Sequence, residues 1–526
     1  TGYGNGTVCV TVYSGKSEIA ADAERDSRNG GKVTMLFNSY IFMLLFLPLA
    51  LAGYYICNGK EKYEWGKLWL TAMSLWFYAW FNPAYLPVIV GSILGNYALY
   101  RVILGHRGRA GYGKKDLYLT AAGAAANLGV LFYYKYFDFF LENCNLIWHT
   151  DFALQHVLLP LGISFFTFQQ VGFLIDTYRG GTENYSFIDY ALFVTFFPQL
   201  IAGPIVTHDE MIGQFRDTGR KRWDAETVSK GLWTFACGLA KKVLIADVFG
   251  RAVAWGYDNM EALNGLTALW VIVSYAVQLY FDFSGYCDMA RGIGLMFRIT
   301  IPVNFFSPYR AVNLVEFWKR WHITLTRFFT KYVYIPLGGS RKGQARTYLH
   351  IMAVYLVSGI WHGAGWTFLL WGALHGLFYV LTKMFLPVLE KIPRVVSWAA
   401  NLILVQILWV FFRSETIGEA VLLLKRAAAG GYALAGVPAA FAEQFHTPEF
   451  FYLFKVLRLN SLPYGSYFLM LGYMGAAWFL LLACRNVSEK LADFRPTPVR
   501  AVWTAGLLLW SLVSFSEVST FLYFNF

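Results

Sequence analysis

The feature that most constrains the fold is a series of long stretches that contain no Asp, Glu, Lys or Arg. They occupy residues 36–59, 68–100, 117–134, 152–175, 190–208, 262–281, 347–382, 395–412, 459–484 and 501–516. A helix needs about 20 apolar residues to cross the hydrocarbon core of a bilayer, and 68–100 and 347–382 have room for more than one element. Only 14% of the 526 residues are charged, whereas soluble domains have roughly 25%. We therefore predict an all-α polytopic membrane protein with roughly 11 to 13 membrane segments.

The remaining charges are distributed unevenly between the loops, and the formal net charge is +12. Loop 101–116 carries five bases and one acid, whereas loop 135–151 carries one base, Lys135, and three acids. The positive-inside rule places the first loop in the cytoplasm and the second outside. Counting back along the chain places Met35, at the start of the first span, outside the cytoplasm. Nucleic acid is excluded as a partner because the chain has no soluble basic domain to hold it.

Residues 1–34 differ in composition from the rest of the chain. They hold four bases, four acids and no apolar core, and they lack the pattern of a signal peptide. Met35 begins an apolar stretch suited to a first spanning helix. We predict that residues 1–34 are a disordered leader or a non-native upstream segment, and that residues 35–526 form a single transmembrane domain.

A broken element is expected within 190–208. This stretch contains FFPQLIAGPIV, with two prolines and a glycine within seven residues. Proline removes a hydrogen bond from a helix interior, and irregular backbone at membrane depth is tolerated only where protein or a water-filled cavity covers it. The sequence therefore predicts a re-entrant or broken element and a hollow interior.

The region 298–346 carries nine bases and one acid, so we expect it to be cytoplasmic and to face an anionic partner. On a helix, Trp318, His322 and Leu325 share one face, while the neighbouring bases point elsewhere. We predict that residues 314–330 form a helix lying at the membrane surface. The alternative for His322 is an incidental residue on a purely structural interfacial helix.

A second histidine, His362, lies in the apolar sequence SGIWHGAGW at 358–366. An ionisable side chain is costly to place in membrane sequence and is therefore a candidate functional residue. The small residues around it permit close helix approach and leave space for a substrate. The alternative is a buried histidine bonded to a carbonyl. His375 lies about 220° from His362 on a continuous helix, so we assign it a structural role.

Asp282, Ser284 and Asp288 lie among aromatic residues in FDFSGYCDMA. The two acids are six residues apart and do not line up on one helical face, so they either hydrogen-bond to backbone or orient a histidine. Two histidines and an acid could bind zinc, but no HExxH or similar spacing occurs, and the six cysteines form no CxxC pair. We therefore expect no metal. The absence of P-loop, GxSxG and GxGxxG motifs in the right context argues against ATP hydrolysis, serine-hydrolase and dinucleotide chemistry.

Several strings resemble the membrane-bound O-acyltransferase (MBOAT) family, in order along the chain. They are FDFSGYCDMARGIGLMF (281–297), NFFSPYRAVNLVEFWKRWHITLTRFF (304–329), YIPLGG (334–339) and WHGAGWTF (361–368). Three further strings are similar to its bacterial polysaccharide branch, typified by the alginate O-acetyltransferase membrane component. They are LPLGISFFTFQ (159–169), FFPQLIAGPI (196–205) and GLAKKVLIAD (238–247). The resemblance covers nearly everything from Met35 onward.

The resemblance implies a ring of tilted helices around a central funnel in the cell (plasma or inner) membrane, with the active site near mid-membrane. It identifies His362 as the catalytic histidine and His322 as the second one. It also implies acetyl transfer from a cytosolic thioester such as acetyl-CoA, with no tightly bound cofactor, to an extracytoplasmic polysaccharide hydroxyl, directly or through an SGNH-type acetyltransferase partner. Membrane lipid surrounds such a protein. The expected donor-binding or substrate-binding residues are Asp282, Ser284, Asp288, Asn304, Trp318, Arg320, Trp361 and Trp366.

Acyl transfer from a thioester to an alcohol requires that the alcohol lose its proton, and imidazole with a pKa near 6.5 suits that role. We expect His362 to be the general base and His322 to place the acyl group or to bind the oxyanion. The basic loop 298–346 would attract the phosphates of acyl-CoA or an acidic carrier protein. Three alternatives are D-alanyl transfer from a carrier protein to teichoic acid, transport of a polysaccharide or lipid, and a scaffold for a partner enzyme. Transporters usually show repeat symmetry or intramembrane charge networks, which this sequence lacks.

Overall fold

The computed structural model describes residues 35–110, 113–456, 464–515 and 521–522, and every regular element within these ranges is a helix. The α-helices of the first half are α2 (Leu47–Gly59), α3 (Tyr63–Phe81), α4 (Leu86–Ala110), α5 (Lys114–Lys135), α6 (Phe137–Trp148), α7 (Ile163–Tyr178), α8 (Phe187–Thr195), α9 (Phe197–Leu200), α10 (His208–Arg216), α11 (Ala225–Ala240) and α12 (Asp247–Asp258). Those of the second half are α13 (Gly265–Met296), α14 (Leu314–Arg320), α15 (Ile323–Phe329), α16 (Ile335–Leu337), α17 (Gln344–His362), α18 (Trp366–Met384), α19 (Leu386–Leu389), α20 (Arg394–Arg413), α21 (Ile417–Ala428), α22 (Ala439–Glu443), α23 (Pro448–Val456), α24 (Gly465–Leu482), α25 (Val487–Ala492) and α26 (Pro498–Val513). The predicted leader at 1–34 lies outside the described residues, so the proposed boundary at Met35 stays a prediction.

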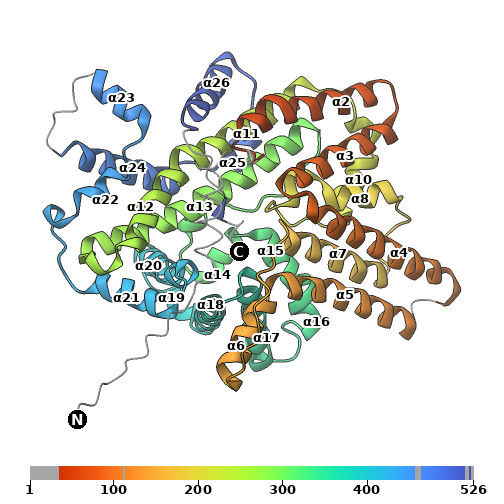
Figure 1. Cartoon of the computed structure of the whole chain (residues 1–526), viewed down its shortest axis with the longest axis horizontal. Helices are drawn as coiled ribbons and strands as arrows, with labels where there is room; N and C mark the ends of the chain where they lie inside the picture. The colour runs from red at the N-terminus through yellow and green to blue at the C-terminus, as the bar shows by residue number, and fades with distance from the viewer. Residues whose placement is uncertain (1–34, 111–112, 457–463, 516–520, 523–526) are drawn as a thin grey trace, which may run out of the picture.

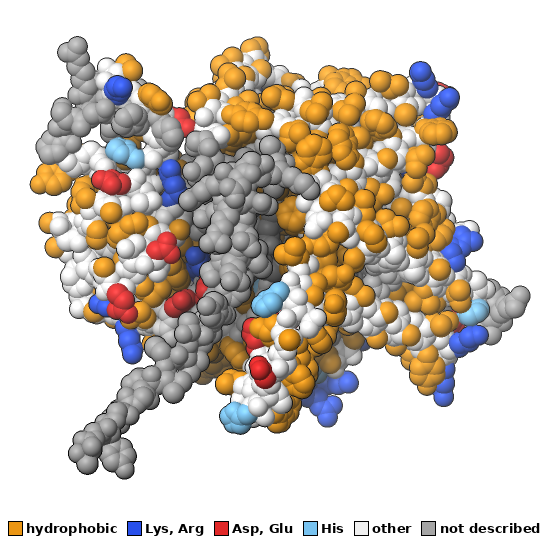
Figure 2. All heavy atoms as spheres, in the orientation of Figure 1, with side chains coloured by type: hydrophobic (Ala, Val, Ile, Leu, Met, Phe, Trp, Pro, Cys, Tyr) orange, Lys and Arg blue, Asp and Glu red, His pale blue; other side chains and the backbone are white. Residues whose placement is uncertain are grey.

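The all-α membrane class is confirmed. Six helices in the described part are long and apolar enough to cross a membrane; they are Phe42–Gly59, Pro83–His106, Lys114–Lys135, Gly265–Met296, Arg394–Arg413 and Gly465–Leu482. This count is lower than the expected 11 to 13. The reason is that other apolar stretches form helices that are short, such as α7, or rich in polar and small residues, such as α17. Figure 2 shows hydrophobic side chains over much of one face, with Lys and Arg at its edges.

Helix α13 is the centre of the fold. It has 32 residues, and 72% of its most apolar 18-residue stretch is buried inside the molecule. Helix α11, the π-helical segment η4 (Lys241–Ala246) and α12 pack along it. Glycine permits this close approach, since a Cβ on Gly238 would lie 2.6 Å from the Gly285 carbonyl oxygen. In Figure 1, α2–α5, α7 and α8 lie at the right of the view, α20–α24 lie at the left, and α14, α17 and α18 lie in the lower middle with α6 near α17.

The predicted break within 190–208 is present. Helix α8 ends at Thr195, the four-residue α9 follows with Pro198 in its first turn, and the chain then turns at 201–203. The side-chain amide of Gln199 donates to the Phe193 carbonyl at 2.9 Å, which satisfies part of the irregular backbone. Every residue from Tyr190 to Val206 is buried. Protein therefore covers this element.

The prediction of one surface helix over 314–330 is wrong. Helix α14 ends at Arg320, and α15 begins at Ile323, with His322 between them in the left-handed region (φ 44°, ψ 53°). The cause is a long-range interaction. The Ile323 N–H donates to the Asn304 carbonyl at 3.0 Å, and the Thr324 N–H donates to Asn304 Oδ1 at 3.2 Å. These bonds replace helical ones at the start of α15 and bury His322, whose exposed fraction is 0%.

The stretch 347–382 contains two helices, as expected. Helix α17 ends at His362, residues 363–365 form an extended link, and α18 begins at Trp366. The two helices form a tight hairpin, because a Cβ on Gly359 would lie 2.4 Å from the Phe368 carbonyl oxygen. The continuous helix assumed for comparing His362 with His375 is therefore wrong.

Candidate active site

The two histidines meet in the interior of the molecule. His322 lies at the N-terminus of α15 and His362 at the C-terminus of α17, and their ring centroids are 6.5 Å apart. Their exposed fractions are 0% and 3%. The two side chains therefore lie together in one buried cluster.

His322 is oriented by Asn304. Its Nδ1 lies 3.1 Å from Asn304 Oδ1, and the same oxygen accepts from the N–H and the hydroxyl of Thr324 at 3.2 and 2.9 Å. Since the Thr324 N–H can only donate, this Asn304 atom is the carbonyl oxygen, and His322 Nδ1 must carry a proton. In the neutral ring Nε2 is then the proton acceptor. The Phe283 ring of α13 packs against the imidazole edge to face at 4.9 Å.

His362 is oriented through its backbone. The Lys135 ammonium at the end of α5 donates to the carbonyl oxygens of Trp361, at 2.5 Å, and of His362, at 3.2 Å. A cation at the C-terminus of a helix stabilises its last carbonyls. The imidazole packs against the rings of Trp371 and Phe412, each at 5.2 Å. From the sequence, Lys135 was interpreted only as a loop charge. Its position directly after the apolar stretch 117–134 is the one feature of the sequence that could have indicated a buried role.

His375 lies in the same aromatic cluster. The Trp318 indole N–H donates to His375 Nδ1 at 3.3 Å, and the Trp371 ring contacts His375 at 4.7 Å as well as His362. The hydrogen bond joins α14 to α18, which fits the structural role expected for His375. A separate face of one helix does not explain that role, because the chain breaks at 363–365.

The acids of α13 form ion pairs with lysines of η4. Asp282 binds Lys242 at 2.6 Å and accepts from the Leu522 N–H at 3.1 Å. Asp288 binds Lys241 at 2.6 Å, and Lys241 also lies 3.4 Å from the Ser284 hydroxyl. Asp282 therefore hydrogen-bonds to backbone, and this is one of the two roles expected for the acids, the other being to orient a histidine. The lysine partners were missed, although both lie in GLAKKVLIAD (238–247). The expectation that the chain lacks charge networks within its membrane segments is therefore wrong, because these ion pairs lie on the candidate span Gly265–Met296.

The other expected site residues divide into two groups. Three of them contact a buried histidine: Asn304 contacts His322, Trp318 contacts His375, and the Trp361 ring contacts His362 at 4.8 Å. Arg320 forms an ion pair with Glu316 at 2.6 Å, and Trp366 is 56% exposed and donates to Asn143 of α6 at 3.1 Å. Within the described residues, no group of three or more His, Cys, Asp or Glu side chains could hold a metal ion.

Two cavities approach the histidine pair. One of about 620 Å³ is lined by Trp361 and Gly363, the residues on either side of His362, together with side chains of α5 and α6. Another of about 220 Å³ lies between α15, α17 and α18, and Trp318 and Ser358 line it. Because both imidazoles are at most 3% exposed, side chains such as Trp361 must move before a substrate touches them.

Several bases of the loop 298–346 are already paired. Arg327 binds Glu210 at 2.6 Å, Lys331 binds Asp176 at 2.8 Å, and Arg320 is held by Glu316. The exposed bases for which the described residues provide no ion pair are Lys319, Arg341, Lys342 and Arg346. The surface available to an anion is thus smaller than the sequence indicated.

The chain is similar to several known proteins. A model described as the MBOAT, membrane-bound O-acyltransferase family matches residues 148–414, which include both histidines. A peptidoglycan O-acetyltransferase of Helicobacter pylori is 39% identical over 525 residues, covering 94% of this chain and 98% of that protein. A protein named "Probable alginate O-acetylase AlgI" of Pseudomonas aeruginosa is 38% identical over 394 residues, 73% of each chain. A teichoic acid D-alanyltransferase of Streptococcus thermophilus is 26% identical over 243 residues, 44% of this chain and 59% of that protein.

The family resemblance read from the sequence is confirmed. The family match covers more than half of the chain, and relatives at 38–39% identity extend over most of it. The chain is a multi-pass membrane enzyme that belongs to the membrane-bound O-acyltransferase family.

Proposed function

We propose that this enzyme transfers acetyl groups from a cytosolic thioester donor across the membrane to hydroxyl groups of an extracytoplasmic glycan. The observation that carries the proposal is the buried pair of imidazoles, with ring centroids 6.5 Å apart, in the interior of an O-acyltransferase. The relative that covers 94% of the chain is named for peptidoglycan. Peptidoglycan is therefore the first acceptor to test.

His362 is the general base in this proposal. As the acceptor oxygen bonds to the thioester carbonyl carbon, its proton passes to the His362 imidazole. The carbon–sulfur bond then breaks, and the leaving thiolate takes the proton from His362 as a free thiol. Lys135 is a positioning residue, because it binds the carbonyls at the end of the helix that carries His362.

His322 has a role limited by its tautomer. With Nδ1–H donated to Asn304, Nε2 is an acceptor in the neutral ring. His322 can then accept a hydrogen bond from the substrate hydroxyl or from an amide of the donor. An oxyanion contact requires a second proton on the ring, so we favour substrate placement over oxyanion binding.

The exposed bases Lys319, Arg341, Lys342 and Arg346 are the proposed attraction site for the donor. Acetyl-CoA carries phosphates, and uncompensated positive charge raises the local concentration of anions. We propose that this surface is cytoplasmic and that Met35 lies on the opposite side of the cytoplasmic membrane. Reporter fusions after residue 113 and after residue 150 test the orientation, since they are expected on opposite sides.

The test uses membranes that contain the protein, radiolabelled acetyl-CoA and an acceptor glycan. His362→Ala and His322→Ala are each expected to abolish glycan acetylation while the protein still inserts. His149→Ala is the matched control, because His149 is an exposed histidine at the end of α6. Wild-type product levels in His362→Ala would refute the mechanism.

The same assay separates the alternatives. A transporter needs no acetyl-CoA, and a scaffold keeps its activity when His362 is replaced as long as its partner binds. The relative named teichoic acid D-alanyltransferase favours D-alanyl transfer as the second candidate, which predicts activity with a D-alanyl carrier protein instead of acetyl-CoA. Dependence of glycan acetylation on an added SGNH-type acetyltransferase would show an indirect route.

A further inference from the structure

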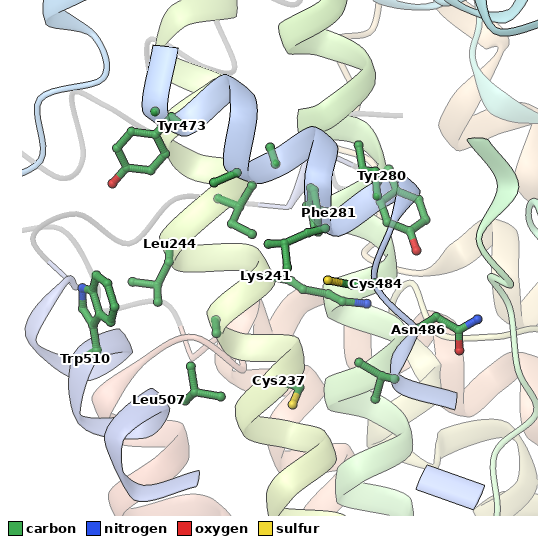
Figure 3. A pocket seen from close by; sticks show the side chains of 18 of the residues that line it. Cys237, Lys241, Leu244, Tyr280, Phe281, Tyr473, Cys484, Asn486, Leu507 and Trp510 are labelled. Carbon is green, nitrogen blue, oxygen red and sulfur yellow. The ribbon is translucent and has the colours of Figure 1, made fainter. Parts of the chain in front are cut away.

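A separate chamber lies on the other side of α13 from α17 and α18, between η4 and the C-terminal helices α24 and α26. Its volume is about 540 Å³. In Figure 3, Leu507 and Trp510 of α26 lie across the space from Leu244, and Tyr473 of α24 lies at one end. The space exists because α24 presents the small residue Gly472, where an added Cβ would meet nothing within 4 Å. The walls in this part are apolar.

The opposite end of the chamber is basic. Lys241, Arg485 and Lys490 line it, and no Asp or Glu is among the described residues that line it. Lys241 is paired with Asp288, and Arg485 is paired with Asp493 at 2.7 Å. Lys490 is exposed and forms no ion pair with any described residue. With two of the three bases paired, Lys490 leaves about one uncompensated positive charge at this end, which an anion can neutralise.

We propose that the chamber binds one membrane phospholipid with an anionic headgroup. An acyl chain occupies the apolar part between Leu244 and Trp510, and the phosphate lies at Lys490 and Arg485. Within a bilayer the chain gains little by leaving other lipid tails, which are as apolar as the chamber. Selectivity must then come from the headgroup, and basic pockets between membrane helices bind anionic headgroups. A glycan does not fit, because the apolar walls would leave its hydroxyls unpaired.

The site lies close to the residue that orients His322. A smaller cavity shares Lys241, Tyr280 and Asn486 with the chamber, and Asn304 also lines it. A bound headgroup is thus next to the wall that holds the Asn304–His322 hydrogen bond. The lipid site does not rest on the proposed reaction, and its test does not use activity.

The test is native mass spectrometry of the purified, delipidated protein with phosphatidylglycerol or the zwitterionic phosphatidylethanolamine. One phosphatidylglycerol molecule is expected to bind in preference to phosphatidylethanolamine. Lys490→Gln and Arg485→Gln should each lower the preference for phosphatidylglycerol about fivefold, because one base near an anionic headgroup contributes roughly 1 kcal/mol to binding. Gly472→Leu should fill the chamber and abolish binding. Gly475→Leu is the matched control, since Gly475 lies on the same helix, has open space around it and does not line the chamber.

Equal binding of the two lipids by the wild type would overturn the proposal. So would unchanged phosphatidylglycerol binding by Gly472→Leu, or an unchanged preference in the Lys490→Gln, Arg485→Gln double variant. The double variant changes only exposed side chains, so it tests the proposal even where Gly472→Leu lowers the yield of folded protein.

Discussion

Lys135 offers a quantitative test of how the fold holds His362. Its ammonium donates to the carbonyls of Trp361 and His362 at 2.5 and 3.2 Å. A hydrogen bond to a charged group contributes about 1.5–3 kcal/mol, and the cation also interacts favourably with the end of the helix. Because these effects describe one contact, we count them once. Lys135→Met should lower the free energy of opening the end of α17 by about 1.5–3 kcal/mol, which raises the open population about 10-fold to 150-fold.

Hydrogen exchange measures this opening directly. Amides in a peptide that spans 358–366 should exchange faster in Lys135→Met, and kcat for acetyl transfer should fall more than KM rises. Lys135→Arg, which keeps the charge and the donors, should restore both. Lys115→Met is the control, because Lys115 is an exposed base at the other end of α5. Unchanged exchange at 358–366 together with unchanged kcat would refute the reasoning.

Three further substitutions test other contacts. Asn304→Leu leaves the Nδ1–H of His322 without its acceptor, at a cost of about 1–3 kcal/mol, so kcat should fall; a wild-type kcat would contradict the assigned tautomer. Gly359→Ala places a Cβ against backbone at 2.4 Å and should destabilise the protein by about 1–3 kcal/mol in thermal unfolding, whereas Gly91→Ala, with open space around it, should not. His375→Gln keeps an acceptor for the indole and should retain most activity; loss as complete as in a His362 variant would give His375 a catalytic role.

Local patterns in the sequence predicted the parts of the fold that local chemistry determines. Charge-free stretches predicted the membrane class because the bilayer excludes charge over the length of a helix. Two prolines and a glycine predicted the break after α8 because proline cannot continue the hydrogen-bond ladder. The cost of burying an ionisable ring made His362 a candidate, and the family resemblance added His322, before their distance was known.

What the sequence did not reveal depends on contacts between distant residues. Helical periodicity favoured a continuous helix through His322, but Asn304, 18 residues earlier, takes the hydrogen bonds that would continue it. Lys135 reaches a carbonyl 227 residues away, and no local pattern encodes that pairing. The lysine partners of the α13 acids were missed for the same reason, since Lys241 and Asp288 are 47 residues apart.

The central claim is that the buried histidine pair passes an acetyl group from one side of the membrane to the other. Proteoliposomes with acetyl-CoA on the side of Arg346 and acceptor glycan on the opposite side test it most directly. Acetylated glycan should form with the wild-type protein and not with His362→Ala. Equal product from both proteins, or product only when donor and acceptor share a side, would contradict the account.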